Sequence, residues 1–355
     1  MGNTTGLEEQ VGLHSETRRV LNQATGQSHG KEGLEIAARD MQIVLDIPGE
    51  EGSLGSSMGG RDGRVRRRED LMEGLGEWDK ARWQACAAEK SGSWLQARPS
   101  IIFNTQLSNG EVQYGIGRRL GCQLCAGGPC PFCLGFMDKE GAHCECCMSG
   151  GDKTVNHNVV RDTTYLQSKR AHAAPQLEVT GISALMGLHT RGDSSSRPAD
   201  VLLARAQDIP TSMGHGAGRV ALDIGIVCPQ AASHLSVAAA EVLGAAESYV
   251  RSKCARADVA RRCSDAGVVF QPLIFESFGG VSTEAVQVLK GLNKAVAVNS
   301  ESSEEDVAQR FWQRVGVDIL RGNYRAFARR VEGWGSGAHA LDAYQGVELL
   351  GPAAV

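Results

Sequence analysis

The chain has 355 residues, which suits one compact domain of ordinary size with appended segments. Its formal net charge of -4 argues against a nucleic-acid-binding protein on totals alone, although local clusters of charge matter more than the total. No run of about 18 consecutive apolar residues occurs, so we expect no membrane-spanning segment. No basic segment followed by an apolar stretch opens the chain, so we expect no secretory signal and a reducing compartment.

Residues 1–75 are rich in Gly, Ser, Glu and Gln, and apart from 41–46 they lack apolar runs able to build a core. Such composition predicts a largely disordered arm. Its basic run at 61–68, RDGRVRRR, is interpreted either as a solvated tether or as a segment that contacts phosphate or directs nuclear import. From Asp70 to Ala97 the chain carries Leu and Trp at loosely helical spacing, which predicts short packed helices, and residues 76–150 are interpreted as this helical lead-in with the cysteine-rich segment that follows it.

That segment holds seven of the eleven cysteines between Cys122 and His157. A CxxC turn sets two thiolates on one side of a metal ion, and a later histidine and cysteine can complete a tetrahedron. The predicted zinc ligands are therefore Cys130, Cys133, His143 and Cys147. Cys144 and Cys146 lie too close in sequence to His143 to share its ion, whereas the preceding pair, Cys122 and Cys125, can substitute or hold a second ion.

Two other interpretations of the cysteines are a disulfide framework and a redox CxxC motif. Disulfides conflict with the absence of a secretory signal. A redox CxxC opens a helix after a strand, whereas these pairs lie among Gly and Pro. The spacing therefore favours zinc.

Beyond residue 150 the pattern changes to alternating helices and short buried strands. An amphipathic helix is predicted at 157–173 and an alanine-rich helix at 233–256, and two final helices are predicted to begin at Ser282 and at a capping box of Ser302 and Glu305. The predicted strands lie at 176–179, 199–204, 219–227 and 267–275. The order indicates an α/β fold, with residues 151–295 as its core and 296–355 as a C-terminal helix and tail.

Each of the first three predicted strands carries one acid, namely Glu178, Asp200 or Asp223. Neighbouring strands would bring these acids to one sheet edge, where they repel unless a cation joins them. Oxygen ligands suit Mg²⁺, and Lys253 on the following helix can lean over the same edge to stabilise charge on a phosphate.

The alternative is that these acids merely end strands or pair with Arg197 and Arg219. The predicted arginine-rich helix from Ser303 to about Val331 also has two interpretations. Its arginines either follow a DNA backbone or are the solvated arginines of an ordinary amphipathic helix.

Several motifs occur together in a fixed order. They are the cysteine cluster, His157-Asn158, Glu178, Arg197-Pro-Ala-Asp200, Leu222-Asp-Ile224, Tyr249-x-x-x-Lys253 and Phe270-x-Pro-Leu-x-x-Glu276-Ser-x-Gly279. Over roughly residues 95–330 the chain resembles the C-terminal part of site-specific non-LTR retrotransposon proteins. That part carries a CCHC zinc knuckle and a restriction-like endonuclease of the PD-(D/E)xK superfamily.

The resemblance implies a restriction-endonuclease-like αβββαβ core with a small N-terminal zinc knuckle and C-terminal helices. It implies that Asp200 and Asp223 bind catalytic magnesium, that Glu178 and Lys253 complete the active site, and that His157 and Asn158 contact DNA or lie at the site edge. It also implies structural zinc, DNA as a partner, RNA or a separate reverse transcriptase as further partners, and nuclear localisation.

The chain departs from the family pattern at several points. Asn156 replaces a basic residue, Ala199 stands before Asp200, Gly225 stands where many members of the superfamily have the lysine, and the 22 residues between Asp200 and Asp223 exceed the usual linker. No Asp-Asp signature of a reverse transcriptase occurs. The expected function is a metal-dependent DNA endonuclease without its polymerase, and the alternative is a catalytically inactive, zinc-stabilised nucleic-acid-binding or structural relic.

Overall fold

The structure is a computed structural model that describes residues 72–179, 199–212, 214, 216, 218–256 and 259–331. Nearly all of the predicted disordered arm, with its basic run, lies outside the described residues, as does Arg197. Among the described helices, none is long and apolar enough to cross a membrane.

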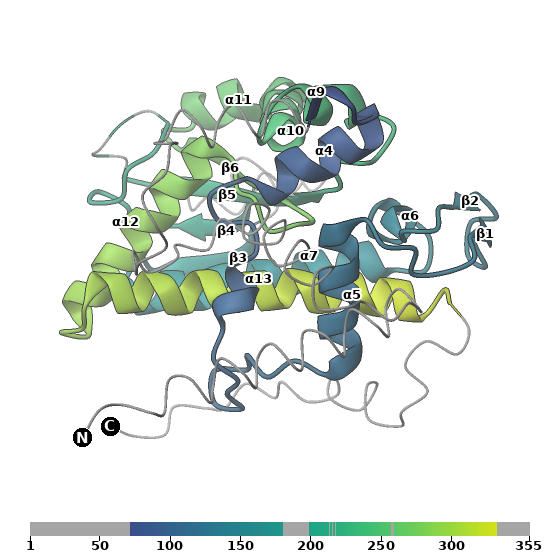
Figure 1. The fold of residues 1–355 in the computed structure, drawn as a ribbon. Coiled ribbons are helices and arrows are strands. Elements are labelled where there is room, and N and C mark those ends of the chain that lie inside the picture. The colour runs from purple at the N-terminus through teal and green to yellow at the C-terminus, as the bar shows by residue number, and fades with distance from the viewer. Residues whose placement is uncertain are drawn as a thin grey trace, which may run out of the picture.

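A four-stranded sheet in the order β3-β4-β5-β6 forms the centre of the fold. Its strands are β3 (Pro175–Val179), β4 (Ala199–Leu203), β5 (Val220–Val227) and β6 (Val269–Glu276), each within a few residues of its predicted bounds. β3 and β4 pair antiparallel, as do β4 and β5, whereas β5 and β6 run parallel. The mixed sheet between helices confirms the predicted α/β class (Figure 1).

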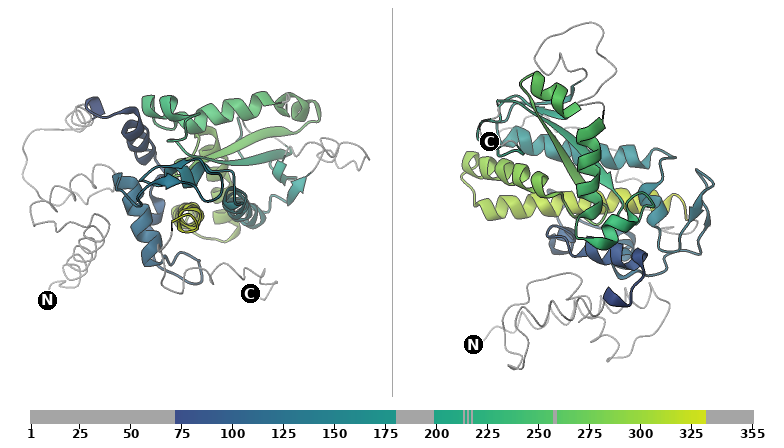
Figure 2. Two further views of the ribbon diagram at one scale, coloured as in Figure 1. Left: turned by 90° about the vertical axis from the view of Figure 1, so that its right-hand side faces the viewer. Right: turned by 90° about the horizontal axis from the view of Figure 1, so that it is seen from above.

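Helices cover both faces of the sheet (Figure 2). One side carries α7 (Asp152–Arg170), α12 (Thr283–Asn299) and α13 (Glu304–Ala328), and the other carries α4 (Glu77–Cys86), α9 (Leu235–Ala240), α10 (Gly244–Ala255) and α11 (Val259–Asp265). Alternate residues of β4 point to opposite sides, because Val201 packs in the cluster that includes α12 and α13, whereas Leu202 packs with Cys263 of α11. Burial on both faces explains the nearly continuous apolar strands.

The N-terminal described part adds η1 (Ser93–Gln96), α5 (Asn109–Leu120) and a small hairpin with a short helix. The hairpin consists of β1 (Gly128–Pro129) and β2 (Phe136–Met137), and α6 (Ala142–Cys146) follows it. The sequence interpretation missed α5, although Ser108 and Glu111 form a complete capping box at its start.

Two predicted helix features were wrong in detail. The single helix at 233–256 is divided into α9 and α10, because Leu243 takes a left-handed conformation with φ of 63° between them. The final helix is capped by Ser303, whose side chain accepts a hydrogen bond from the Asp306 amide at 3.4 Å, and not by Ser302.

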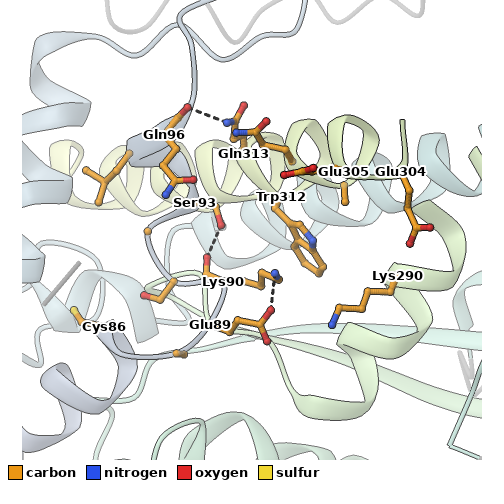
Figure 3. A pocket seen from close by; sticks show the side chains of 16 residues that line it. Cys86, Glu89, Lys90, Ser93, Gln96, Lys290, Glu304, Glu305, Trp312 and Gln313 are labelled. Carbon is orange, nitrogen blue, oxygen red and sulfur yellow. Dashed lines mark hydrogen bonds and ion pairs between the residues drawn. The ribbon is translucent and has the colours of Figure 1, made fainter. Parts of the chain in front are cut away.

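Two hollows adjoin the N-terminal half of α13 and share Gln309 and Gln313 in their walls. The first, of about 630 Å³, lies between the loop before η1 and helices α12 and α13, with Trp312 in its wall (Figure 3). The second, of about 780 Å³, is lined by α7, α13 and the loop at 98–105.

Candidate functional site

The three predicted acids lie in one row across neighbouring strands. Leu177 pairs with Val201 and Val179 with Ala199, so Glu178 of β3 lies opposite Asp200 of β4. Val201 of β4 pairs with Leu222 of β5, and the next step of the same register aligns Asp200 with Asp223. The strand register therefore aligns the three acids across the sheet.

Asp200 is held by α7, which packs on one face of the sheet. Its Oδ2 lies 3.1 Å from Nε2 of His157 on α7 and accepts the Ile224 backbone N–H at 2.7 Å. Burial raises the pKa of Asp200, but His157 and the Ile224 amide outweigh burial, so the pKa lies below its usual value. Asp200 is thus an ionised carboxylate at neutral pH.

His157 itself is oriented by Asn158. Its Nδ1 lies 3.3 Å from Asn158 Oδ1, so both ring nitrogens face oxygen acceptors. Only the protonated imidazole can donate from both nitrogens. Burial lowers the pKa of His157, but Asp200 and Asn158 raise it to a net value above the usual one. These contacts place His157 and Asn158 beside the acids.

Asp223 carries the second carboxylate and a lysine partner. Lys253 Nζ of α10 lies 2.9 Å from Asp223 Oδ1. Burial raises the pKa of Asp223, Lys253 lowers it, and the adjacent Asp200 raises it again, with a net value above the usual one. The strand register makes the two carboxylates neighbours, and one cation or one shared proton relieves the repulsion between them.

One oxygen of each of the two carboxylates accepts no hydrogen bond from the described residues. Asp200 uses Oδ2 for both of its donors and Asp223 uses Oδ1 for Lys253. Among the described residues, no donor hydrogen bonds to Asp200 Oδ1 or Asp223 Oδ2. These two oxygens are therefore the ones without a hydrogen-bond donor in the described part of the chain.

Glu178 is positioned differently. It forms an ion pair with Arg161 of α7, one helical turn beyond His157, and its backbone φ is 47°. The structure does not bring Glu178 into a group of three close ligands with Asp200 and Asp223; within the described part of the chain, the sole such group of His, Cys, Asp and Glu is a cysteine–histidine cluster. The predicted alternative partner Arg197 lies outside the described residues, and Asp200 and Asp223 pair with His157 and Lys253 instead.

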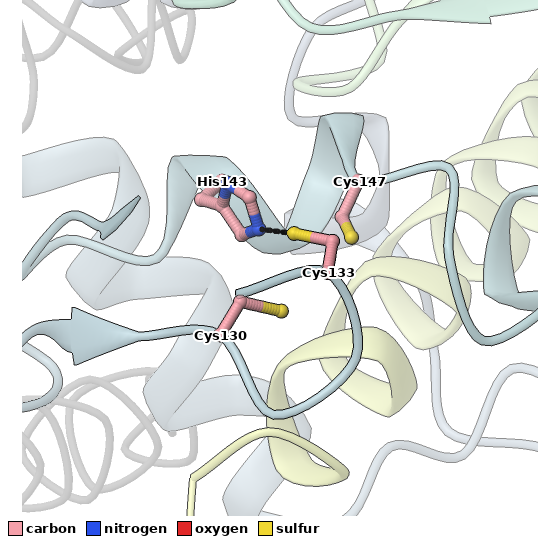
Figure 4. A group of neighbouring side chains, drawn as sticks. All are labelled: Cys130, Cys133, His143 and Cys147. Carbon is pink, nitrogen blue, oxygen red and sulfur yellow. Dashed lines mark hydrogen bonds between the residues drawn. The ribbon is translucent and has the colours of Figure 1, made fainter. Parts of the chain in front are cut away.

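That cluster is the predicted ligand set Cys130, Cys133, His143 and Cys147 (Figure 4). Its four ligand atoms all lie within 4.8 Å of one another, an arrangement that can hold a tetrahedral metal ion such as zinc. The loop between β1 and β2 supplies the first two residues, and α6 with the residue after it supplies the others. Asp138 fixes α6 by accepting the amides of Ala142 and His143 at 2.9 and 2.7 Å.

The environment of Cys130 differs from that of Cys144 and Cys146, which lie beside the cluster. Burial raises the pKa of Cys130, but the amides of Phe132 and Cys133 lower it, with His143, to about 6. A thiolate at neutral pH is what a metal requires. Burial instead raises the pKa of Cys146 to about 11 and that of Cys144 still further, so both remain thiols.

Cys122 and Cys125 do not join the cluster. Both pack among the apolar residues around α5, and burial raises the pKa of each thiol. The second pair therefore neither substitutes for the four ligands nor forms a further metal group among the residues that the structure describes.

A buried ion pair joins this small metal-binding unit to the rest of the molecule. Glu145, on α6 between the ligands, accepts Arg118 Nε at 2.7 Å, the Tyr114 hydroxyl at 2.9 Å and the Ser277 hydroxyl at 2.7 Å. The Arg118 and Glu145 side chains are each 2% exposed. Removing one partner of such a pair costs about 3–5 kcal/mol.

Sequence reasoning missed this pair and also missed Arg161. The signal for Arg161 was present, because a residue four positions after His157 lies on the same helical face. No local signal in the sequence indicates the pairing of Glu145 and Arg118, which are 27 residues apart.

Comparisons with family models, with curated proteins and with solved structures found no match for this chain.

Proposed function

We propose that the chain is a metal-dependent DNA endonuclease of the restriction-like type, with the active site at the Asp200–Asp223 row. The observation that carries the proposal is the pair of close carboxylates on adjacent strands, each with one oxygen left over, beside the Lys253 ammonium. The element order of helix, three antiparallel strands, helices and a parallel strand is consistent with the expected core.

Asp200 Oδ1 and Asp223 Oδ2 would hold Mg²⁺, which suits oxygen ligands and keeps several waters. When bound, the ion supplies positive charge for a phosphate oxygen and lowers the pKa of a coordinated water. His157 and the Ile224 amide hold Asp200 in place, and Lys253 stabilises negative charge on the attacked phosphate. Attack of water on phosphorus would form a new P–O bond and break the bond to the 3′ oxygen. The leaving oxygen takes up a proton, which leaves a 3′ hydroxyl and a 5′ phosphate.

The test is a plasmid-nicking assay in Mg²⁺ or Mn²⁺. Asp223→Asn is expected to abolish nicking, because it removes the charge that holds the ion. Lys253→Ala is expected to slow nicking by about a hundredfold, as for a preorganised electrostatic group.

Asp265→Asn is the matched control, since Asp265 is an exposed carboxylate on α11 that pairs with Arg261. This variant should cut like the wild type. Equal cutting by the wild type, Asp223→Asn and Lys253→Ala would place the activity elsewhere. Absence of cutting by folded wild-type protein would contradict the proposal and favour the inactive relic.

A further inference from the structure

The second hollow beside α13 has an unusual concentration of positive charge. Five cationic side chains line it, whereas Asp306 is the one acid in its walls. The cationic residues are Arg98, Lys169, Arg170, Arg310 and Arg314. Because the whole chain has a formal net charge of -4, this charge is a local feature.

Most of that charge is uncompensated. Arg314 is committed to Asp318, with Nε 2.9 Å from the carboxylate. The other four cations form no ion pair with a carboxylate among the described residues, and Arg170 contacts just the Gln167 side-chain oxygen, at 3.4 Å. Their field attracts a polyanion.

The same hollow also exposes apolar and aromatic surface. Phe103 is 54% exposed and Leu166 47% exposed, and both line it. The Arg310 guanidinium lies 6.0 Å from the centre of the Phe103 ring. A nucleic-acid base stacks on such an aromatic face or on a guanidinium plane.

We propose that this hollow binds single-stranded nucleic acid, with phosphates on Arg98, Arg170 and Arg310 and bases against Phe103 and Leu166. A duplex keeps its base faces inside the stack and offers phosphates alone, so it would leave the apolar surface unused. The concave shape, at about 780 Å³, suits a strand better than a flat membrane surface.

This binding site is separate from the proposed active site. Thr163 of α7 donates to Asp318 of α13 at 2.7 Å, so this side of α7 faces α13, whereas His157 and Arg161 face the strands. Strand binding in the hollow therefore goes beyond the proposed nuclease activity and does not depend on it.

The first hollow provides an internal comparison (Figure 3). Glu89, Glu304 and Glu305 outnumber its two lysines, and Lys90 is paired with Glu89 at 2.7 Å and lies over Trp312. Its walls therefore do not attract a polyanion. The remaining lysine, Lys290, is exposed and supplies a matched control.

The experiment is fluorescence anisotropy of the full chain with a labelled oligothymidylate and with a labelled duplex, at several salt concentrations. The wild type should prefer the single strand. Arg170→Gln with Arg310→Gln should weaken binding by at least about tenfold and lower the log–log salt slope by about 1.4, at about 0.7 per lost phosphate contact.

Phe103→Ala should weaken single-strand binding while leaving the salt slope unchanged, because stacking carries no charge. Lys290→Gln should bind like the wild type, and so should Asp223→Asn, which separates this site from the nuclease proposal. Unchanged affinity in the double arginine variant, equal or tighter binding of the duplex, or stronger binding to anionic lipid vesicles than to the oligonucleotide would each overturn the inference.

Discussion

Glu276 is a carboxylic acid buried at the end of β6, with 1% of its surface exposed. Its Oε1 accepts the Ala246 amide at the start of α10 at 3.3 Å, whereas Oε2 has no hydrogen-bond partner in the described part of the chain. Burial, with a smaller contribution from Glu247, raises the pKa of Glu276 to about 7. The folded protein therefore holds this proton more tightly than the unfolded chain does.

The stabilisation due to the Glu276 proton is complete below about pH 4.5 and is lost as the pH rises through about 7. At about 1.4 kcal/mol per pKa unit, the loss amounts to at most about 3 kcal/mol. Glu276→Gln should therefore gain stability relative to the wild type between pH 5 and pH 8, as measured by urea unfolding. Glu284→Gln, at an exposed position in α12, should show no such change, and a pH-independent difference for Glu276→Gln would refute the assignment.

Close packing around Gly225 explains why β5 carries no lysine at this position. A Cβ at this position would lie 2.9 Å from Ile274 Cδ1 and 3.0 Å from Tyr249 Cε1. Tyr249 of α10 therefore packs where a lysine on β5 would begin. Lys253 lies one turn further along α10 and reaches Asp223 from there.

At the scale of elements, the cysteine–histidine cluster fastens a hairpin and a short helix that have little apolar core of their own. α6 has five residues and β1 and β2 two each, so their fold depends on the metal ligands and on Glu145. Loss of the ion should loosen this unit and, through the Glu145–Arg118 pair, weaken its attachment to α5.

Purified protein should contain about one zinc ion per chain, and chelation should lower the melting temperature, because metal binding there is folding energy. Cys133→Ser should lose the zinc, since it removes an exposed ligand. Cys146→Ser is the matched control and should keep the zinc, because burial keeps Cys146 a thiol. Metal analysis that finds no zinc in freshly reduced wild type, or equal zinc in both variants, would contradict this ligand set.

Across the whole molecule, alternating and apolar patterns in the sequence predicted the strands well. β5 was predicted at 219–227 and lies at Val220–Val227. α5 was missed because its buried face includes Gly115 and Gly117, which lie close against Trp94 and Leu124 where larger apolar residues would reveal a helix. Close packing of this kind leaves no periodic signal.

Most residues of the candidate site were singled out from the sequence, but Arg161 and the pairing of the acids were not. Acids on successive strands indicated a shared edge, whereas the register that aligns Asp200 with Asp223 arises from long-range pairing. The arginines of α13 and of the residues directly after it show the same limit. Arg314, Arg321 and Arg330 form ion pairs with acids of α13, α5 and α7. Spacing in the sequence alone cannot distinguish such paired arginines from arginines on a basic surface.

The most direct test of the central claim is electron paramagnetic resonance titration of Mn²⁺ into zinc-loaded protein. If Asp200 and Asp223 share one divalent ion, the wild type should bind about one Mn²⁺ per chain, Mg²⁺ should compete, and Asp223→Asn should lose this site while Asp265→Asn keeps it. Identical Mn²⁺ binding by the wild type and Asp223→Asn would contradict the account.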